Sequence, residues 1–224
     1  MNKNFSKSES NGLALLGQKN LLIYSPGIST AGVAEIEMAK SNNKRKIIAT
    51  SIDDIGIRTT QDIVQKAGFN NQIIIKNEDV AKKLSYQDDH FDFIYARLIL
   101  HYLSRQELDK ALAELFRVLK KGGKIFVVVR STDDPENGYS YAKFHPDTCL
   151  TEYFFTDEKK IVHKDRLVYR YFHDQQTIND HLTKAGFKIN SLKQYNEQLY
   201  IDFERKKLST TVANVIEVIA EKIN

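Results

Sequence analysis

The chain has a single cysteine, Cys149, among its 224 residues, and this scarcity excludes several kinds of structure. An internal disulfide is excluded, and so is a metal site built on a pair of cysteines. A chain without disulfides fits a reducing compartment, so we expect a cytoplasmic protein. A metal site made of His145, His163 and His173 would need histidines at helical spacing or a cysteine partner, and the chain has neither. We therefore expect no metal.

Long apolar runs are also absent. No stretch approaches the roughly 18 apolar residues of a membrane-spanning helix, so we expect no membrane partner. Residues 1–11 are polar and lack the apolar core of a secretion signal, and we expect them to be flexible. No internal repeat or linker divides the rest, and the length suits one sizeable core. We expect one domain over residues 1–224.

Neither sign of charge forms a block. The 33 lysines and arginines against 29 acidic residues give a formal charge of +4. No basic run marks a nucleic-acid groove, so the sequence gives no support for a nucleic-acid partner. A serine hydrolase is also disfavoured, because no G-x-S-x-G turn occurs anywhere in the chain.

Glycine is scarce where a ligand-binding loop would need it. An apolar run that starts at Leu21 breaks at Pro26 and Gly27, and a helical pattern follows Gly32. A buried strand, a tight turn and a helix N-terminus form the usual cradle for a nucleotide-like ligand. Only one glycine stands in the turn itself, whereas such a loop usually carries two or three.

Strand and helix patterns alternate along most of the chain. We predict strands at 20–25, 46–51, 72–76, 91–96 and 124–129, with helices between them and another helix at 174–185. Ser104 and Glu107 form a capping box for one helix, and Gly122-Gly123 is expected to close it. Two strands, at 187–195 and 199–205, are predicted to form an antiparallel hairpin, and Ser209 is predicted to start a final helix. The pattern predicts an α/β fold: a Rossmann-like, doubly wound, mostly parallel seven-stranded sheet with helices on both faces.

Residues 131–172 interrupt this alternation after the fifth strand. The segment combines turn signals with many aromatic residues, so we predict an insertion or lid at the carboxyl edge of the sheet. Such a lid could bury an apolar or planar substrate and exclude water. Its aromatics could equally pack on the domain or form a dimer contact, and the apolar face of the final helix is a second candidate surface for a homodimer.

The order of elements over residues 12–205 resembles that of class I S-adenosylmethionine-dependent methyltransferases. The most specific stretch is Phe91–Val129, with an apolar strand carrying Asp92, then Leu100-His101-Tyr102-Leu103, an amphipathic helix and Arg117-Val118-Leu119-Lys120-Lys121-Gly122-Gly123. Ala185-Gly186-Phe187 before the sixth strand also matches. The resemblance implies S-adenosyl-L-methionine as cofactor and methyl transfer by in-line displacement to a small-molecule acceptor.

The resemblance also implies where the cofactor would lie, across the carboxyl ends of the first, second and fourth strands. The glycine-rich loop of the family matches Ser25, Pro26, Gly27, Ile28 and Ser29, and the ribose-binding position matches Ser51. Val80 stands where the family has its adenine-edge carboxylate, with Glu78 and Asp79 beside it as substitutes. Ala96 and Arg97 would border the methionyl part of the cofactor.

Several family positions depart from the usual residues. Ile23 replaces an acidic residue, Ser25 and Ser29 replace glycines, and neither Ser51 nor Val80 is acidic. Asp53 and Asp54 are close enough in sequence to replace the carboxylate missing at Ser51. The departures leave open a methyltransferase-like protein that has lost catalysis and serves as a binding or scaffold partner. A nicotinamide-dependent oxidoreductase shares the parallel sheet, but the missing G-x-G-x-x-G and the terminal hairpin count against it.

Two histidines are candidates for a general base in methyl transfer. His101 follows the fourth strand and His145 lies in the insertion. His101 could instead be a helix-packing residue, and Tyr102 beside it is expected to lie in the core.

Overall fold

A central sheet of seven strands, in the order β3-β2-β1-β4-β5-β10-β9, organises the molecule. The computed structural model describes residues 5–28, 32–157, 159–200 and 206–223. The strands are β1 (Leu22–Pro26), β2 (Lys46–Ser51), β3 (Ile73–Asn77), β4 (Phe91–Arg97), β5 (Leu119–Arg130), β9 (Lys188–Tyr200) and β10 (Leu208–Glu221). The pairs among β1 to β5 are parallel, and β10 is antiparallel to both β5 and β9. The predicted fold class is confirmed.

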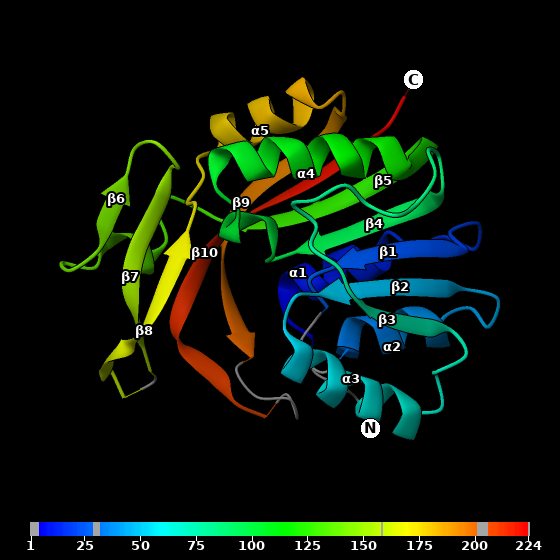
Figure 1. The fold of residues 1–224 in the computed structure, drawn as a ribbon, viewed down its shortest axis with the longest axis horizontal. Coiled ribbons are helices and arrows are strands. Elements are labelled where there is room, and N and C mark those ends of the chain that lie inside the picture. Colours follow the sequence, from blue (N-terminus) through cyan, green and yellow to red (C-terminus); the bar gives the residue numbers. More distant parts are fainter. Residues whose placement is uncertain (1–4, 29–31, 158, 201–205, 224) are drawn as a thin grey trace.

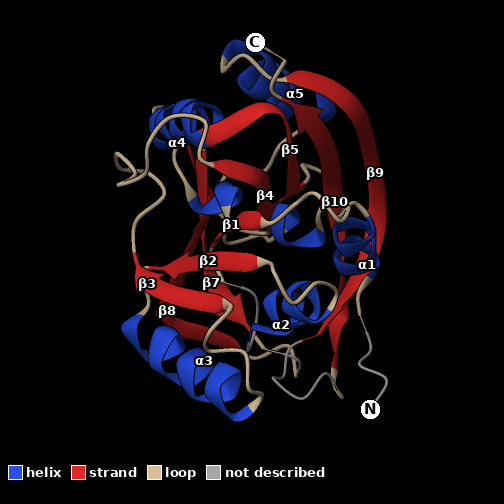
Figure 2. Ribbon diagram, turned by 90° about the vertical axis from the view of Figure 1, so that its right-hand side faces the viewer, coloured by secondary structure: helices blue, strands red, loops and turns tan. Residues whose placement is uncertain are grey.

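Helices cover both faces of this sheet (Figures 1 and 2). The helices of one face are α1 (Lys7–Ala14), α2 (Val33–Lys40) and α3 (Asp54–Lys66), and those of the other are α4 (Arg105–Val118) and α5 (Gln175–Lys184). The side chain of Asp53 caps α3, and Ser104 with Glu107 forms the predicted capping box of α4. Each face therefore has its own apolar core. No helix among the described residues is long and apolar enough to cross a membrane.

The prediction for the end of the chain was wrong in two elements. The strand predicted at 199–205 is not a separate hairpin strand, because residues 199 and 200 continue β9 and residues 201–205 lie outside the described residues. The segment from Ser209 onward is not a helix but the strand β10, which pairs with β5 on one side and β9 on the other. Val215, Ile216 and Val218 are all buried, because this strand is covered on both faces. Apolar residues on both faces do not alternate, so their spacing resembled that of a helix. The dimer surface expected on a terminal helix therefore has no such helix to carry it.

Two other boundaries differ from the prediction. Residues 7–11 are not an unstructured tail but belong to α1, which starts with a capping box of Ser6 and Glu9. Gly12 lets this helix approach the sheet, since a Cβ there would lie 2.5 Å from the ring of Tyr95. At the other boundary, α4 ends at Val118 and β5 begins immediately, so the glycine pair does not cap that helix.

The insertion after β5 forms a second, three-stranded antiparallel sheet. It consists of the 3₁₀ turn η3 (Pro135–Gly138) and the strands β6 (Lys143–His145), β7 (Leu150–Thr156) and β8 (Val162–Arg170). We call residues 131–172 the lid. Figure 1 shows the small sheet standing beside the carboxyl end of β5. The backbone N–H of Tyr171 donates to the carbonyl of His101 at 2.7 Å, so the lid is tied to the 3₁₀ turn η2 (Leu100–Tyr102) after β4.

Candidate functional site

A cavity of about 250 Å³ lies at the carboxyl ends of β1, β2 and β3 and under η2, and we call it the sheet-edge cavity. Its position matches the crevice where parallel sheets with this strand order bind ligands, beside the point where the order reverses between β1 and β4. The lining residues are Gly27, Thr50, Ser51, Ile52, Glu78, Asp79, Val80, Ala81, Ile99, Tyr102, Leu103 and Glu107.

Gly27 shapes one side of this cavity. Its φ is +68°, a conformation that L side chains rarely adopt. A Cβ at this position would lie 2.5 Å from Cγ1 and 2.7 Å from Cβ of Ile99, so a side chain would also collide with the opposite wall. The next residue, Ile28, donates its backbone N–H to the carbonyl of Thr50 at 2.9 Å, which ties the loop to the end of β2. One glycine therefore suffices for the turn.

Ser25, Pro26 and Ile28, the other predicted loop residues within the described part of the chain, do not line the cavity. Ser25 is buried, and its hydroxyl donates to Oε1 of Glu35, a fully buried residue of α2, at 2.7 Å. Pro26 is buried at the end of β1, and Ile28 is half-buried. Ser29 lies outside the described residues. The serine that replaces a family glycine at position 25 thus binds a buried carboxylate below the loop.

The end of β2 contributes hydroxyl groups and an exposed apolar side chain. Ser51 is half-buried and its Oγ accepts the backbone N–H of Asp53 at 3.1 Å, while Ile52 is 71% exposed beside it. Asp53 caps α3 by accepting from Ile55, and Asp54 accepts from Asn77. Neither aspartate lines the cavity.

The loop after β3 supplies the carboxylates of the cavity. Glu78 accepts hydrogen bonds from the phenol of Tyr24 at 3.3 Å and from the hydroxyl of Ser85 at 3.1 Å. Burial raises the pKa of Tyr24, so this phenol stays protonated and donates. Asp79 faces Lys82 at 3.6 Å, and Val80 is buried with its side chain in the core. Glu78 is thus held in place at the cavity wall.

The two predicted residues after β4 lie elsewhere. Ala96 is fully buried in the core. Arg97 points toward α1, where it donates to Ser8 Oγ at 2.6 Å and lies 3.5 Å from Glu9 and 3.8 Å from Glu197 of β9. Its charge serves the contact between the N-terminal helix and the last strands, and neither residue lines the cavity.

Sequence reasoning missed seven of the twelve residues that line the cavity. Tyr102, expected in the core, is 47% exposed and lines the cavity instead. The other residues missed are Thr50, Ile52, Ala81, Ile99, Leu103 and Glu107. Several of them stand within a few residues of a predicted strand end, which is the signal that could have found them. Tyr102 comes from η2 and Ile99 directly precedes it, and no local pattern predicts the path of this turn.

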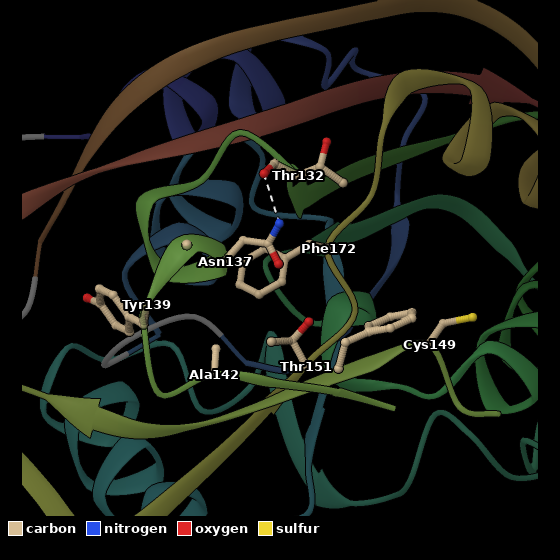
Figure 3. Close-up of a pocket in the computed structure, with 9 residues that line it drawn as sticks. Thr132, Asn137, Tyr139, Ala142, Cys149, Thr151 and Phe172 are labelled. Carbon is tan, nitrogen blue, oxygen red and sulfur yellow. Dashed lines mark hydrogen bonds between the residues drawn. The ribbon is translucent and has the colours of Figure 1, made fainter. Parts of the chain in front are cut away.

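A second cavity, of about 470 Å³, lies within the lid, and we call it the lid cavity (Figure 3). It is lined by Thr132, Asn137, Gly138, Tyr139, Ala142, Phe144, Cys149, Thr151 and Phe172. Asn137 donates its side-chain amide to the carbonyl of Thr132 at 3.0 Å, which closes one wall. None of these lining residues is an aspartate, glutamate, histidine, lysine or arginine. The wall is neutral, with a few hydroxyl and amide groups.

The two candidate bases are not brought together. His101 in η2 is 1% exposed, and its Nδ1 has no hydrogen-bond partner among the described residues. Burial lowers its pKa well below the ordinary value, with Arg170 and Arg130 acting in the same direction, so the ring is neutral. His145 in β6 faces Glu152 at 3.3 Å. Neither histidine lines the sheet-edge cavity or the lid cavity.

Metal ligands are not clustered in the described part of the chain. No group of three or more histidine, cysteine, aspartate or glutamate side chains there is arranged to hold a metal ion. His163 pairs with Asp157 at 3.0 Å, while His173 is fully buried between β5 and α5.

The part of the chain that carries most of the sheet-edge cavity matches a known sequence family. Residues 28–127 match the family model described as a methyltransferase domain. The chain is 25% identical over 149 residues to the demethylmenaquinone methyltransferase of Bacteroides fragilis, covering 63% of this chain and 58% of that protein. It is 31% identical over 119 residues to the ubiquinone/menaquinone biosynthesis C-methyltransferase UbiE of Vibrio campbellii, covering 52% of this chain and 44% of that protein. The chain thus matches well under two thirds of the length of these relatives.

Solved structures share the whole fold. A SAM-dependent methyltransferase from Methanosarcina mazei superposes with a TM-score of 0.72 at 18% identity, covering 98% of this chain and 99% of that one. The [4+2]-cyclase SpnF superposes with a TM-score of 0.64 at 15% identity, covering 96% and 79% of the two chains. At such identities the likeness concerns the fold alone. The cyclase shows that this fold does not by itself decide the reaction.

Proposed function

We propose that the chain transfers a methyl group from S-adenosyl-L-methionine to a small neutral molecule. The premise is the class I methyltransferase fold of the chain, together with its resemblance to that family, which implies this cofactor. The observation that carries the proposal is the sheet-edge cavity, which lies at the carboxyl ends of β1 and β2. Gly27 keeps this cavity open where any side chain would close it. Its volume is near the lower end of the roughly 300–1,000 Å³ typical of ligand pockets.

The residues of the sheet-edge cavity suit the nucleoside part of the cofactor. The hydroxyl of Ser51 would hydrogen-bond the ribose, and the exposed side chain of Ile52 offers an apolar face for the adenine ring. Glu78, held by Tyr24 and Ser85, is the carboxylate at hand for an amine or hydroxyl donor. Gly27 would let the backbone approach the methionyl part. Together, these residues would take over the binding role of the acidic residue that the family carries at the position of Ser51.

The lid cavity suits the methyl acceptor. Its neutral wall, with Tyr139 and Phe172, favours a planar acceptor without charge. When bound, the cofactor would supply an electrophilic methyl group for in-line displacement by the acceptor. The protein's part is alignment and the exclusion of water. The names of the two relatives from Bacteroides fragilis and Vibrio campbellii refer to quinones, whose rings are neutral and planar, and this supports the proposed class.

A proton lost from the acceptor needs a place to go. His101 remains our candidate, because its ring is neutral and lies 4.5 Å from the ring of Tyr102, which lines the sheet-edge cavity. A base with a pKa well below neutrality accepts protons only from an acidic acceptor, such as an enol. We do not carry His145 forward, because its ring lies against Glu152, outside both cavities.

Calorimetric titration tests the proposal directly. Purified protein is titrated with S-adenosylmethionine and with S-adenosylhomocysteine, and we expect one site per chain for each. NADH serves as the control ligand, since an oxidoreductase with this sheet would bind it. Absence of heat from both sulfur compounds at high protein concentration would overturn the proposal and favour a binding protein without catalysis.

A further inference from the structure

The wall of the sheet-edge cavity carries an excess of negative charge. Its lining includes three carboxylates, those of Glu78, Asp79 and Glu107, and none of the lining residues is a lysine, arginine or histidine. Glu78 and Asp79 come from the loop after β3, whereas Glu107 lies in the first turn of α4. Because the cavity measures only about 250 Å³, a ligand that fills it lies close to both groups of carboxylates.

Hydrogen-bond donors hold all three carboxylates in place. Oε2 of Glu107 accepts the backbone N–H of Ser104 at 2.9 Å and its hydroxyl at 2.6 Å, and these bonds lower the pKa of Glu107. Asp79 accepts the backbone N–H of Ala81 at 3.0 Å, and Glu78 accepts from two hydroxyl groups. Donors of this kind stabilise the charged form of a carboxylate.

The cations beside the cavity are exposed or already paired. Lys82 lies 3.6 Å from Asp79, but its side chain is 80% exposed, so water screens this contact. Arg170, whose guanidinium carbon lies 5.2 Å from the ring centre of Tyr102, pairs with Glu136 at 2.8 Å. Neither cation lines the cavity, so its wall keeps a net negative charge.

The proposed cofactor and its product differ in charge at one atom. S-adenosyl-L-methionine has a sulfonium, an ammonium and a carboxylate group, so it is a net cation. S-adenosylhomocysteine lacks the methyl group, its sulfur is a thioether, and the molecule is neutral overall. A wall of carboxylates attracts the cation and gives the neutral product no such advantage. Ile99 and Leu103 make part of the same wall apolar, and charges beside apolar groups are screened less than in water.

We propose that the carboxylates of the sheet-edge cavity make it select the sulfonium cofactor over the neutral thioether product, which is therefore held less tightly. This inference rests on the proposed function and deepens it by naming what distinguishes bound cofactor from bound product. It requires no contact between a carboxylate and the sulfur itself, because the attraction between unlike charges acts over several ångströms.

Calorimetric titration of the intact protein measures this preference. The ligands are S-adenosyl-L-methionine, S-adenosylhomocysteine and sinefungin, in which a protonated amine stands in place of the sulfonium. At about 20 mM salt we expect both cationic ligands to bind about tenfold more tightly than the thioether. At about 0.5 M salt the difference should shrink to about threefold, because ions then screen charges over a few ångströms.

Two results of these titrations would overturn the proposal. One is equal affinity for all three ligands, or tighter binding of the thioether, at low salt. The other is a preference for S-adenosyl-L-methionine that sinefungin does not share, since that would assign the difference to the methyl group and not to the charge.

Substitution of Glu107 supplies a second readout. Glu107→Gln removes the charge but keeps a side chain that can serve in a capping box, so we expect α4 to start as before. Affinity for S-adenosyl-L-methionine should fall about threefold, while that for S-adenosylhomocysteine should stay constant. Ser104→Ala is the matched control, because it weakens the same cap and keeps the charge, so it should leave the preference unchanged. Equal losses for both ligands in the Glu107 variant would show a merely structural role and reject the proposal.

The two proposals fail separately. Absence of heat from all three ligands contradicts the methyltransferase function. Binding of cofactor and product with equal affinity leaves that function standing and rejects only the selection by charge.

Discussion

The two cavities at the carboxyl edge of the sheet are lined by different kinds of residue. The sheet-edge cavity is formed by the short loops after parallel strands and includes three carboxylates, those of Glu78, Asp79 and Glu107. The lid cavity is formed by an insertion and has no charged lining residue. The fixed ends of parallel strands suit a polar ligand that the fold always meets at the same place, whereas an insertion is free to vary with the acceptor. The paired charges of Arg130, Asp134, Glu136 and Arg170 line neither cavity.

Substituting Glu136, which pairs with both Arg130 and Arg170, should have the largest effect. Glu136→Gln leaves the guanidinium groups of Arg130 and Arg170 facing only Asp134. We expect the free energy of unfolding to fall by about 3 kcal/mol, measured by urea denaturation, because breaking a buried ion pair leaves an uncompensated charge. Glu152→Gln, which disturbs an outer contact with His145, should cost less than about 1 kcal/mol. Equal losses of stability in the Glu136 and Glu152 variants would contradict the distinction between an inner and an outer ion pair.

Closing the sheet-edge cavity should abolish cofactor binding and spare the lid. Gly27→Ala adds a Cβ that meets Ile99, and we expect affinity for S-adenosylhomocysteine to fall about 100-fold by calorimetry, or about 2.7 kcal/mol. Gly68→Ala is the matched control, because its φ of +79° carries the same backbone strain but nothing lies within 4 Å of the new Cβ. Both variants carry the backbone strain but only Gly27→Ala adds the clash with Ile99, so a similar loss of affinity in both would refute the assignment of the cavity.

The region where the lid joins the sheet should be sensitive to acid. Burial, and to a lesser degree the nearby His181, lowers the pKa of His173 to about 3, whereas an unfolded histidine has a pKa near 6.5. The unfolded chain therefore binds more protons between these values, and stability is present above pH 6.5 and lost as the pH falls. We expect unfolding at pH 5 to require about 2 kcal/mol less than at pH 7.

A substitution isolates the contribution of His173. His173→Gln should flatten the decline measured by urea denaturation at several pH values. His163→Gln, which alters a half-buried histidine paired with Asp157, should leave the slope nearly unchanged. His101, whose pKa is also lowered, acts in the same direction, so part of the decline should persist in the His173 variant. An unchanged slope in that variant would contradict the prediction.

The smallest effect is expected at the end of β2. Ser51→Ala removes a neutral hydrogen bond from the proposed ribose contact, and we expect S-adenosylmethionine affinity to fall about threefold to tenfold. Ser41→Ala, at the distant end of α2, is the control and should change nothing. A loss above 100-fold would show that Ser51 does more than supply one neutral hydrogen bond.

The sequence predicted the first five strands and most of the helices because their apolar patterns are local. The strand from Lys46 to Ser51 and the capping box of Ser104 and Glu107 agree with the structure residue by residue. The last strand was mistaken for a helix, since Leu208–Glu221 is buried on both faces and its valines and isoleucines do not alternate. Its pairing with β5, more than 70 residues earlier in the chain, leaves no local trace.

The candidate site also has residues that the sequence predicted and residues that it did not. Gly27, Ser51, Glu78, Asp79 and Val80 line the sheet-edge cavity, because each stands at the end of a strand or within three residues after it. Ser25 and Arg97 stand at strand ends too, yet the first binds Glu35 and the second binds α1. Which side of the sheet a terminal residue faces depends on the twist and length of its strand, and those depend on the neighbouring strands.

By itself, then, the sequence determined the class of fold, the order of its elements and the place of the aromatic insertion, because apolar periodicity, caps and turn residues act over a few positions. Only the tertiary structure decided that Gly27 alone keeps the sheet-edge cavity open, that Tyr102 leaves the core to line it, and that Arg170 pairs with Glu136. These features join residues tens of positions apart in the chain, and such contacts exist only once the sheet and the lid are packed together.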